Sequence, residues 1–511
     1  MLARSLSATP WGIEARPVEV EVDVQTGLPQ IQIVGLPDAA VRESRDRVRS
    51  ALRNCGFDLP PRAVTVNLAP ADLRKEGNHL DLAIAVALLS AHGVIGGDRL
   101  ERRLLVGELG LDGAVRPVRG ALSIADAAAR LGCSQILLPT ANAAEAAALD
   151  ALPAIGVSSL PDLLGHLDGA TPLAPCPPDG DWRPAAEPAV DLADVRGQAV
   201  AKRALEIAAA GGHNLLLIGP PGAGKTLLAR TLPGILPPLE RSEAVAVTKI
   251  HSLVAEEPPS GLLRLRPFRA PHSGVSPPGL IGGGPLSRPG EASLAHAGVL
   301  FLDELAEFRR DALEGLRQPL EDGIVTISRA RATHRFPARF TLVAAMNPCP
   351  CGHLGDPRHA CRCPLPLIER YRSRISGPLL DRIDLHVEVP ALLLSELREE
   401  RSERSAAVAA RVRAAREHQR GRFAPAHPAP VNASLEGPML RRHCLLDDAG
   451  RALLETAFER LGLSARALTR ILRVARTIAD LASAERIQVA HVAEAVQFRS
   501  LDRRMLARNA S

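Results

Sequence analysis

The sequence predicts an α/β protein with a parallel sheet domain at its centre, and three segments carry that prediction. Each is a short, predominantly apolar run, which is typical of a strand buried on both faces. The first run ends in a glycine-rich loop, the second in two acidic residues and the third close to an asparagine. These runs are Leu215–Ile218, Gly298–Leu302 and Phe340–Ala345. Because ligands bind beyond the carboxyl ends of parallel strands, the three polar segments are expected to share one site.

The glycine-rich loop follows the first strand and opens a predicted helix. Its residues are Gly219, Pro220, Pro221, Gly222, Ala223, Gly224, Lys225 and Thr226. Glycines allow backbone N–H groups to surround phosphates, and the helix N-terminus adds a favourable dipole. Lys225 can reach the β- and γ-phosphates, and Thr226 can bind Mg²⁺. The alternative is a chance glycine-rich turn, but the flanking strand and helix favour a site for ATP and Mg²⁺.

The other two strands end in residues that suit hydrolysis of a bound nucleotide. Asp303 can hold Mg²⁺ through water, and Glu304 can orient and polarise the attacking water. Their alternative role is an exposed acidic helix start, where acids are favoured in any case. Asn347 can bridge the attacking water and the γ-phosphate, although an Asn-Pro pair also starts turns. We therefore expect Lys225, Asp303, Glu304 and Asn347 to act together.

The organisation of the 511-residue chain suggests about three domains. The N-terminal part alternates strand-like and helix-like stretches, and Val18–Val24 and Ile31–Val34 are expected to be neighbouring strands. A proline-rich stretch follows, then the parallel-sheet segment, then a part with only helical patterns. The predicted units are an N-terminal domain at 1–165, a linker at 166–190, an α/β domain at 191–391 and a helical domain at 392–511.

The composition of the chain limits the kinds of binding partner that it favours. Aromatic residues make up only 2% of the chain, which argues against binding single strands on an aromatic platform. A net charge of +5 permits a nucleic-acid partner without requiring one. No apolar run reaches the length of a membrane span, and the first residues do not resemble a signal peptide. These features predict no membrane partner, and cysteines that are not spread like a disulfide framework predict a cytoplasmic protein.

Four of the eight cysteines form a paired pattern, Cys349-Pro-Cys351 and Cys361-Arg-Cys363. Four thiolates with this spacing suit tetrahedral Zn²⁺ in a closed, structural site. His353 and His359 are alternative ligands. Four free thiols are the other possibility, and the spacings are not those usual for an iron–sulfur cluster.

Several stretches make the sequence similar to AAA+ ATPases of the magnesium-chelatase-like group, and more narrowly to the YifB/ComM family. They are Arg266–His272, Leu280–Gly284, Gly298–Leu305 and Ser376–Asp384, and the resemblance extends to about residue 500. It implies that 191–391 is an AAA+ core with a four-cysteine insertion at 349–363. It also implies that 392–511 is a helical lid of the magnesium-chelatase C-terminal type.

The resemblance assigns four further roles. Gln198 lies in a segment that resembles the one bordering the adenine, and Asn347 matches sensor 1. Arg382 matches the arginine finger, which would reach the γ-phosphate held by a neighbouring subunit. Arg466 matches sensor 2 on the lid. Ordinary surface ion pairs are the alternative for both arginines. A finger that acts on a neighbour implies a ring, which we expect to be a homo-hexamer.

Residues 60–140 resemble the proteolytic domain of Lon-type proteases. Active members need a serine nucleophile and a lysine base. The corresponding positions here hold His79 and Leu122. We therefore expect a retained Lon-like α+β fold without peptidase chemistry.

Three functions remain open. The resemblance implies a DNA motor for branch migration in recombination or natural transformation. Arg329 and Arg331, at the tip of a predicted hairpin, would then grip phosphates together with Arg264, Arg266 and Arg269. A solvated hairpin is the alternative. The second function is a protein-remodelling factor or unfoldase, which scarce aromatics disfavour. The third is a metal-chelatase motor subunit, which the Lon-like domain and the cysteines disfavour.

Overall fold

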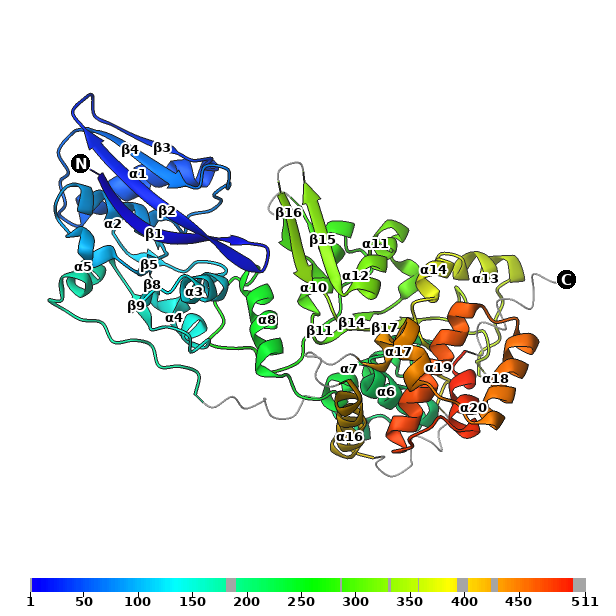
Figure 1. Cartoon of the computed structure of the whole chain (residues 1–511). Coiled ribbons are helices and arrows are strands. Elements are labelled where there is room, and N and C mark those ends of the chain that lie inside the picture. The colour runs from blue at the N-terminus through cyan, green and yellow to red at the C-terminus, as the bar shows by residue number, and fades with distance from the viewer. Residues whose placement is uncertain are drawn as a thin grey trace.

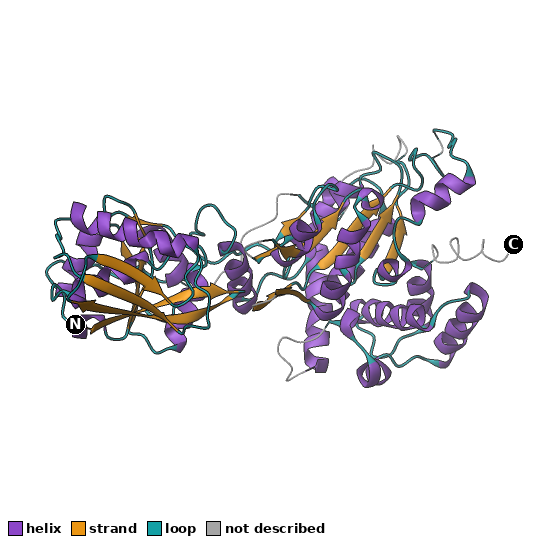
Figure 2. Cartoon of the chain, turned by 90° about the horizontal axis from the view of Figure 1, so that it is seen from above, coloured by secondary structure: helices purple, strands orange, loops and turns teal. Residues whose placement is uncertain are grey.

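A computed structural model describes residues 2–180, 190–284, 287–329, 332–356, 358–392, 403–423 and 431–499. The chain forms an N-terminal lobe and a second lobe that combines the parallel sheet with a helical bundle (Figures 1 and 2). Helix α8 (Arg241–Ser252) lies between the lobes. None of the helices in the described ranges has the length and apolar character that a membrane span needs.

The N-terminal lobe is built on a mixed seven-stranded sheet in the order β3-β4-β2-β1-β5-β8-β9. Its strands are β1 (Leu2–Trp11), β2 (Glu14–Gln25), β3 (Gln30–Val34), β4 (Ala63–Ala69), β5 (Arg103–Leu105), β8 (Gln135–Pro139) and β9 (Ala154–Val157). In β2, alternate valines are fully buried, as the period-two pattern predicts. The prediction that β2 and β3 are neighbours is wrong, because β4 lies between them. The hairpin partner of β2 is β1, which pairs with Glu14–Asp23.

Helices cover both faces of this sheet. They are α1 (Ala39–Asn54), α2 (Asp81–Ala91), α3 (Ala121–Arg130), α4 (Thr140–Ala147) and α5 (Leu160–Asp168). Residues of α1, α2 and α5 share one apolar core, and residues of α3 and α4 share a second core on the other face. Every residue of α2 is buried, which explains why that segment is apolar all round. A short hairpin, β6 (Glu108–Leu109) with β7 (Val115–Arg116), completes the lobe.

The central sheet is parallel throughout, with the order β11-β14-β17-β10-β18. Its strands are β10 (Leu215–Ile218), β11 (Phe268–Arg269), β14 (Val299–Leu302), β17 (Thr341–Met346) and β18 (Leu385–Glu388). The three predicted strands are β10, β14 and β17, which lie side by side. Their carboxyl ends therefore meet at one edge. The outer strands β11 and β18 were not predicted: β11 is only 2 residues long, and the apolar residues of β18 are interrupted by His386.

Helices surround this sheet and form the C-terminal bundle. Those closest to the sheet and in the bundle are α6 (Ala199–Gly211), α7 (Lys225–Ile235), α16 (Ser405–Phe423), α17 (Gly437–His443), α18 (Asp448–Leu461), α19 (Ala465–Leu481) and α20 (Val489–Gln497). Helix α16 is rich in charged residues, a composition typical of a solvated helix. Instead its Val412 and Ala415 are buried, and Gln419 donates a hydrogen bond to the Ala210 carbonyl at 2.9 Å.

The remaining elements are short. They are α9 (Pro277–Ile281), β12 (Gly282–Gly283), β13 (Arg288–Pro289), α10 (Glu291–Leu294), α11 (Arg310–Gly315), α12 (Arg317–Asp322), β15 (Ile324–Arg329), β16 (Ala332–Pro337), α13 (Leu365–Arg372) and α14 (Gly377–Leu380). Strands β15 and β16 form the predicted antiparallel hairpin, which projects from the second lobe (Figure 1).

The two lobes contact each other through α8 and the hairpin. Lys249 of α8 forms an ion pair with Asp126 of α3 at 2.7 Å. Leu122 of α3 packs in a small apolar cluster with Leu239 and Leu262 of the second lobe. The ring of Trp11, at the end of β1, lies 4.7 Å from that of His334 in β16. The N-terminal lobe is thus docked against the hairpin.

Candidate nucleotide site

The glycine-rich loop lies between β10 and α7, as a phosphate loop requires. Gly222 and Gly224 have φ values of 76° and 88°, which favour glycine. Lys225 is the first residue of α7, and its Nζ donates to the carbonyls of Gly219 and Pro220 at 2.7 and 2.9 Å. Burial lowers the pKa of Lys225, while the neighbouring carboxylates of Asp303 and Glu304 oppose that shift. The ammonium is therefore held inside the loop that would enclose phosphates.

Residues from three strands converge on this loop. The Thr226 hydroxyl donates to Asp303 at 2.8 Å, and Lys225 Nζ donates to the Asn347 side-chain oxygen at 3.2 Å. Glu304 adopts a left-handed φ of 52°, which is uncommon for a residue other than glycine and is often found at functional sites. A hydroxyl and a carboxylate this close are suitable oxygen ligands for Mg²⁺. The structure thus brings together the residues predicted for ATP, Mg²⁺ and hydrolysis.

Gln198 joins this site from the N-terminus of α6. Its side-chain amide donates to the Ala223 carbonyl at 3.2 Å and to the Pro390 carbonyl at 2.8 Å. It therefore links the phosphate loop to the segment after β18. Gly219 of the phosphate loop also lies against this segment. A Cβ at Gly219 would lie 2.1 Å from the Val389 carbonyl oxygen, so only glycine allows the two backbones to come this close.

The two arginines implied by the family resemblance lie together, away from this loop. The Arg382 guanidinium contacts Glu321 and the Pro378 carbonyl, and only 11% of its side chain is exposed. Arg466 lies 3.7 Å from Asp381 and is 73% exposed. Burial and then the nearby guanidinium groups of Arg317, Arg470 and Arg466 lower the pKa of Arg382. Buried Arg382 Nε has no hydrogen-bond partner, so this cationic cluster has donor capacity left for an anion.

The sheet separates Arg382 from the phosphate loop of its own chain. Asn214 precedes β10 and donates to the Arg382 carbonyl at 2.9 Å, whereas Gly219 follows β10. At about 3.3 Å per residue, the two ends of this segment are about 17 Å apart. Arg382 therefore lies at the amino edge of the sheet and the phosphate loop at the carboxyl edge.

The four clustered cysteines converge on one another. The Cys349 sulfur lies 3.4 Å from that of Cys351 and 3.6 Å from that of Cys361. The Cys351 and Cys361 sulfurs are 3.7 Å apart, and the ligand atoms of all four, including Cys363, lie within 4.8 Å of one another. Four ligands at about 2.3 Å in a tetrahedron would be about 3.8 Å apart, so the sulfurs fit Zn²⁺.

The two histidines considered as alternative ligands form a separate group. His353 and His359 place Nδ1 atoms 3.5 and 3.0 Å from an Asp356 carboxylate oxygen. The backbone N–H of Arg358 is the main cause of a pKa near 2 for Asp356. The thiolate of Cys351 accepts from the His353 backbone N–H, which lowers the pKa of this thiol to about 6. The two histidines are therefore grouped with Asp356, and the four cysteines form a separate group.

In the N-terminal lobe, the two positions expected to correspond to the Lon-type serine and lysine hold buried side chains, His79 and Leu122. Burial lowers the pKa of His79 to about 4, so its ring is neutral near pH 7. Leu122 is fully buried against the second lobe. Leu122 therefore contributes to the contact between the lobes.

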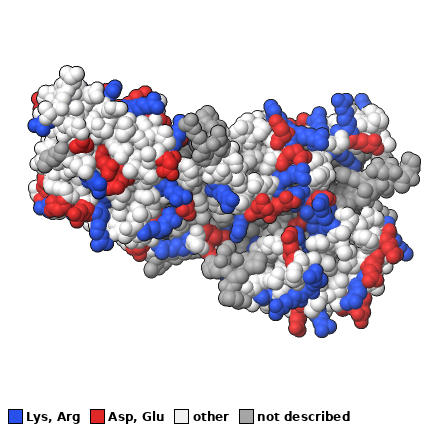
Figure 3. All heavy atoms as spheres, turned by 45° about the horizontal axis from the view of Figure 1, so that its top comes forward, with Lys and Arg blue, Asp and Glu red and all other residues white. Residues whose placement is uncertain are grey.

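The structure describes only some of the residues that were expected to contact DNA. Arg329 ends β15, but its side chain and the whole of Arg331 lie outside the described residues. Arg264, Arg266 and Arg269 each form an ion pair within the chain, with Asp179, Glu243 and Glu291 respectively. On the face in Figure 3, acidic and basic side chains are interspersed, without one dominant basic patch.

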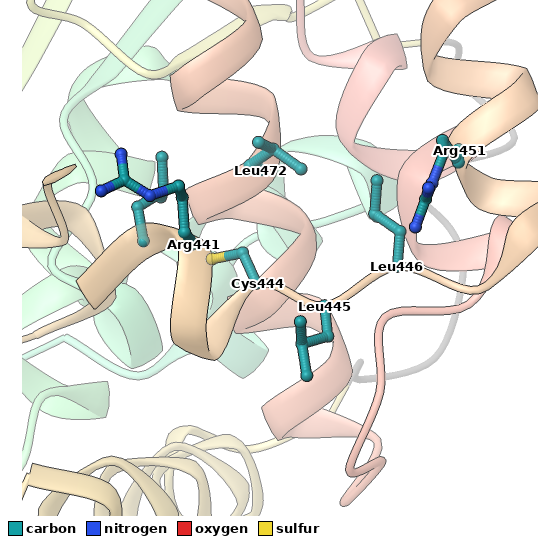
Figure 4. A pocket seen from close by; sticks show the side chains of 7 residues that line it. Arg441, Cys444, Leu445, Leu446, Arg451 and Leu472 are labelled. Carbon is teal, nitrogen blue, oxygen red and sulfur yellow. The ribbon is translucent and has the colours of Figure 1, made fainter. Parts of the chain in front are cut away.

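A pocket of about 260 Å³ opens in the C-terminal helical bundle, far along the chain from the phosphate loop. Leu446 and Leu472 line it, and Arg441 and Arg451 lie at its margin (Figure 4). Burial raises the pKa of its Cys444 thiol to about 11, so this thiol is protonated near neutral pH. The pocket contains none of the residues predicted to act on a nucleotide.

Sequence patterns missed a buried polar network that links the C-terminal helical bundle to the sheet. His213 lies 3.0 Å from Asp384 and 2.7 Å from the Thr477 hydroxyl of α19, and Arg470 pairs with Asp384 at 3.1 Å. Burial opposes ionisation of Asp384, but hydrogen bonds from His213 and Arg470 hold its pKa well below its usual range. No local pattern could have revealed these contacts, because the partners are distant in sequence.

The parallel sheet and its phosphate-loop site define an ATPase of the AAA+ magnesium-chelatase-like class. Family matches cover most of the chain: "Subunit ChlI of Mg-chelatase" at 20–142, "Magnesium chelatase, subunit ChlI" at 191–397 and "Magnesium chelatase, subunit ChlI C-terminal" at 402–499.

Full-length relatives specify the family further. The chain is 46% identical to YifB of Salmonella typhimurium and to YifB of Escherichia coli, over 97% of this chain and 96% of each relative. It is 44% identical to the competence protein ComM of Haemophilus influenzae, over 98% of both chains. The chain belongs to the YifB/ComM family.

Proposed function

We propose that this protein is an ATP-driven DNA motor that works as a homo-hexameric ring and promotes branch migration in recombination or natural transformation. The observation that carries the ring is the separation of Arg382 from its own phosphate loop. Arg382 and Arg466 would complete the site of a neighbouring copy, where their positive charge stabilises the transferred phosphoryl group. Hydrolysis then depends on assembly.

Within one subunit, each residue has a distinct task. The loop from Gly219 to Thr226 encloses the phosphates, and Gln198 borders the base. Lys225 neutralises phosphate charge, while Thr226 and Asp303 would hold Mg²⁺, which supplies further charge neutralisation. Glu304 orients the attacking water with Asn347. These roles explain why residues from three strands converge at one edge.

The DNA contact is proposed for the β15–β16 hairpin. Its tip carries Arg329 and Arg331, whose charges would bind phosphates without reading bases. The name of the Haemophilus relative, a competence protein, supports a role in DNA uptake and exchange. The docking of Trp11 beside His334 would support the hairpin from the N-terminal lobe.

The four cysteines are proposed to hold one structural Zn²⁺. Their sulfur separations suit a closed tetrahedral site, which has no open position for catalysis. Thiolate ligands need a reducing compartment, in keeping with a cytoplasmic location.

The test is the ATPase rate of the purified chain with single-stranded DNA, duplex DNA, a four-way junction or an unfolded protein. Stimulation greatest with the junction supports the motor, and Lys225→Ala controls for contaminating ATPases. Sedimentation with nucleotide measures ring size. If unfolded protein alone stimulates hydrolysis, the protein is an unfoldase and the DNA proposal is wrong.

A further inference from the structure

The loop between the two cysteine pairs lies directly against the phosphate loop. Gly352 follows the first pair and has a φ of 84°. A Cβ at this position would lie 2.7 Å from Pro221 Cδ and 2.9 Å from Pro221 Cγ. Real Cβ atoms essentially never approach another atom so closely, so the backbone at Gly352 already packs on Pro221. Only glycine permits this contact between the cysteine loop and the phosphate loop.

The same loop is joined to Asn347 through a short, well-supported segment. Cys349 lies two residues after Asn347 and is fully buried. The Gly352 N–H donates to the Cys349 carbonyl at 3.0 Å, and Arg372 donates to the Pro348 carbonyl at 3.1 Å. A displacement of the first cysteine pair would therefore act on both Asn347 and Pro221.

The second cysteine pair follows the first after nine intervening residues. Cys361 lies 3.6 Å from Cys349 and 3.7 Å from Cys351, sulfur to sulfur. A metal ion at the centre of the four sulfurs would replace these weak contacts with bonds. It would close the loop and fix where Gly352 lies.

We propose that the ion bound by the four thiolates orders the phosphate loop, so that metal occupancy controls nucleotide binding. The ion, a thiophilic divalent cation such as Zn²⁺, holds Gly352 against Pro221 and steadies Asn347. The inference rests on the proposed nucleotide and zinc sites, and gives the cysteine insertion a role in the ATP cycle. The cysteines and Gly352 are positioning residues, since none touches the reacting atoms.

The chain supplies a matched pair of glycines for the test. Gly355 belongs to the same loop, has a φ of 83°, and has no atom within 4 Å of the position a Cβ would take. Alanine at either position carries the same backbone strain, but only Gly352→Ala collides with Pro221. Comparison of the two variants therefore isolates the contact.

The measurements use the full-length protein without DNA: zinc per chain by metal analysis, and Kd for a fluorescent ADP analogue. We expect Gly352→Ala to keep its zinc and to bind nucleotide about tenfold more weakly, because small misplacements of positioning groups have effects of at least this size. Gly355→Ala should match the wild type. In the double variant with Pro221→Ala, the added methyl should cost less than it does alone, because the colliding ring atoms are gone.

A second arm removes the metal. Cys361→Ser should lose zinc and show the same weakened nucleotide binding. Its circular dichroism spectrum and the fold of its N-terminal lobe should remain as in the wild type. Wild-type Kd in Gly352→Ala or in the zinc-free protein overturns the proposal, as does equal weakening in Gly355→Ala. A chain that binds nucleotide as expected here but is not stimulated by DNA would refute the motor and leave this inference standing.

Discussion

The separation of the two halves of the ATPase site makes a quantitative prediction about mixed rings. Lys225→Ala removes the phosphate-binding ammonium, and Arg382→Ala removes the finger. Each variant alone should lose activity, the second by roughly 10³- to 10⁵-fold, the range for arginine fingers. Because Asn214 anchors Arg382 about 17 Å from Gly219, no side chain can bridge the gap within one subunit. The two variants should therefore complement each other.

The size of the recovery follows from counting interfaces. In a randomly mixed ring at equal amounts, about one interface in four joins an intact Lys225 to an intact Arg382 of the neighbour. An equimolar mixture should regain about a quarter of the wild-type ATPase rate. The assay is steady-state phosphate release after co-dilution and reassembly with ATP. A mixture no more active than its components would show that Arg382 does not act on a neighbour.

Four further predictions follow from other parts of the structure. Glu304→Gln should slow hydrolysis by about 10²-fold or more and retain ATP binding, as measured by single-turnover assays and analogue titration. Arg329→Ala with Arg331→Ala should weaken DNA binding and reduce the salt slope by about two, whereas unchanged binding would exclude the hairpin. Asp384→Asn should destabilise the lid, because it breaks a buried ion pair with Arg470; urea unfolding should show a loss of about 3 kcal/mol or more. Acid should destabilise the wild type. Burial lowers the pKa of His79 and His296 to about 4 in the folded protein. In the unfolded chain both histidines take up protons as the pH falls below about 6.5, which favours unfolding. Each of these histidines should cost roughly 2 kcal/mol at pH 5, and a flat stability between pH 7.5 and pH 5 would contradict this account.

Local patterns predicted the elements whose residues repeat in a short window. The apolar runs of β10, β14 and β17 and the valine alternation of β2 are patterns of this kind. Strand β1 escaped prediction because serine and threonine occupy its buried positions, among them Ser5, Ser7 and Thr9. Helices packed on the sheet supply the burial, as where the Ser5 hydroxyl donates to the Ala83 carbonyl of α2, and a single strand does not reveal what covers it.

The residues of the candidate site also fall into two groups, those whose placement local patterns predicted and those whose placement they did not. Gly219–Thr226, Asp303, Glu304 and Asn347 were expected to meet because each follows a parallel strand. The sequence did not indicate that Arg382 lies at the opposite edge of the sheet, because that depends on β18 pairing beside β10. Nor did it indicate that Arg264, Arg266 and Arg269 are occupied by carboxylates of the same chain.

The phosphate loop and the cysteine pairs were determined by the sequence itself, since the chemistry of each depends on neighbouring residues with fixed spacing. Their relation to each other was decided only by the tertiary structure. Gly352 meets Pro221 because β17 lies beside β10 in the sheet, which brings the segments after the two strands to one edge. Strand order is set by packing between distant segments, and for that reason no short stretch of sequence could disclose it.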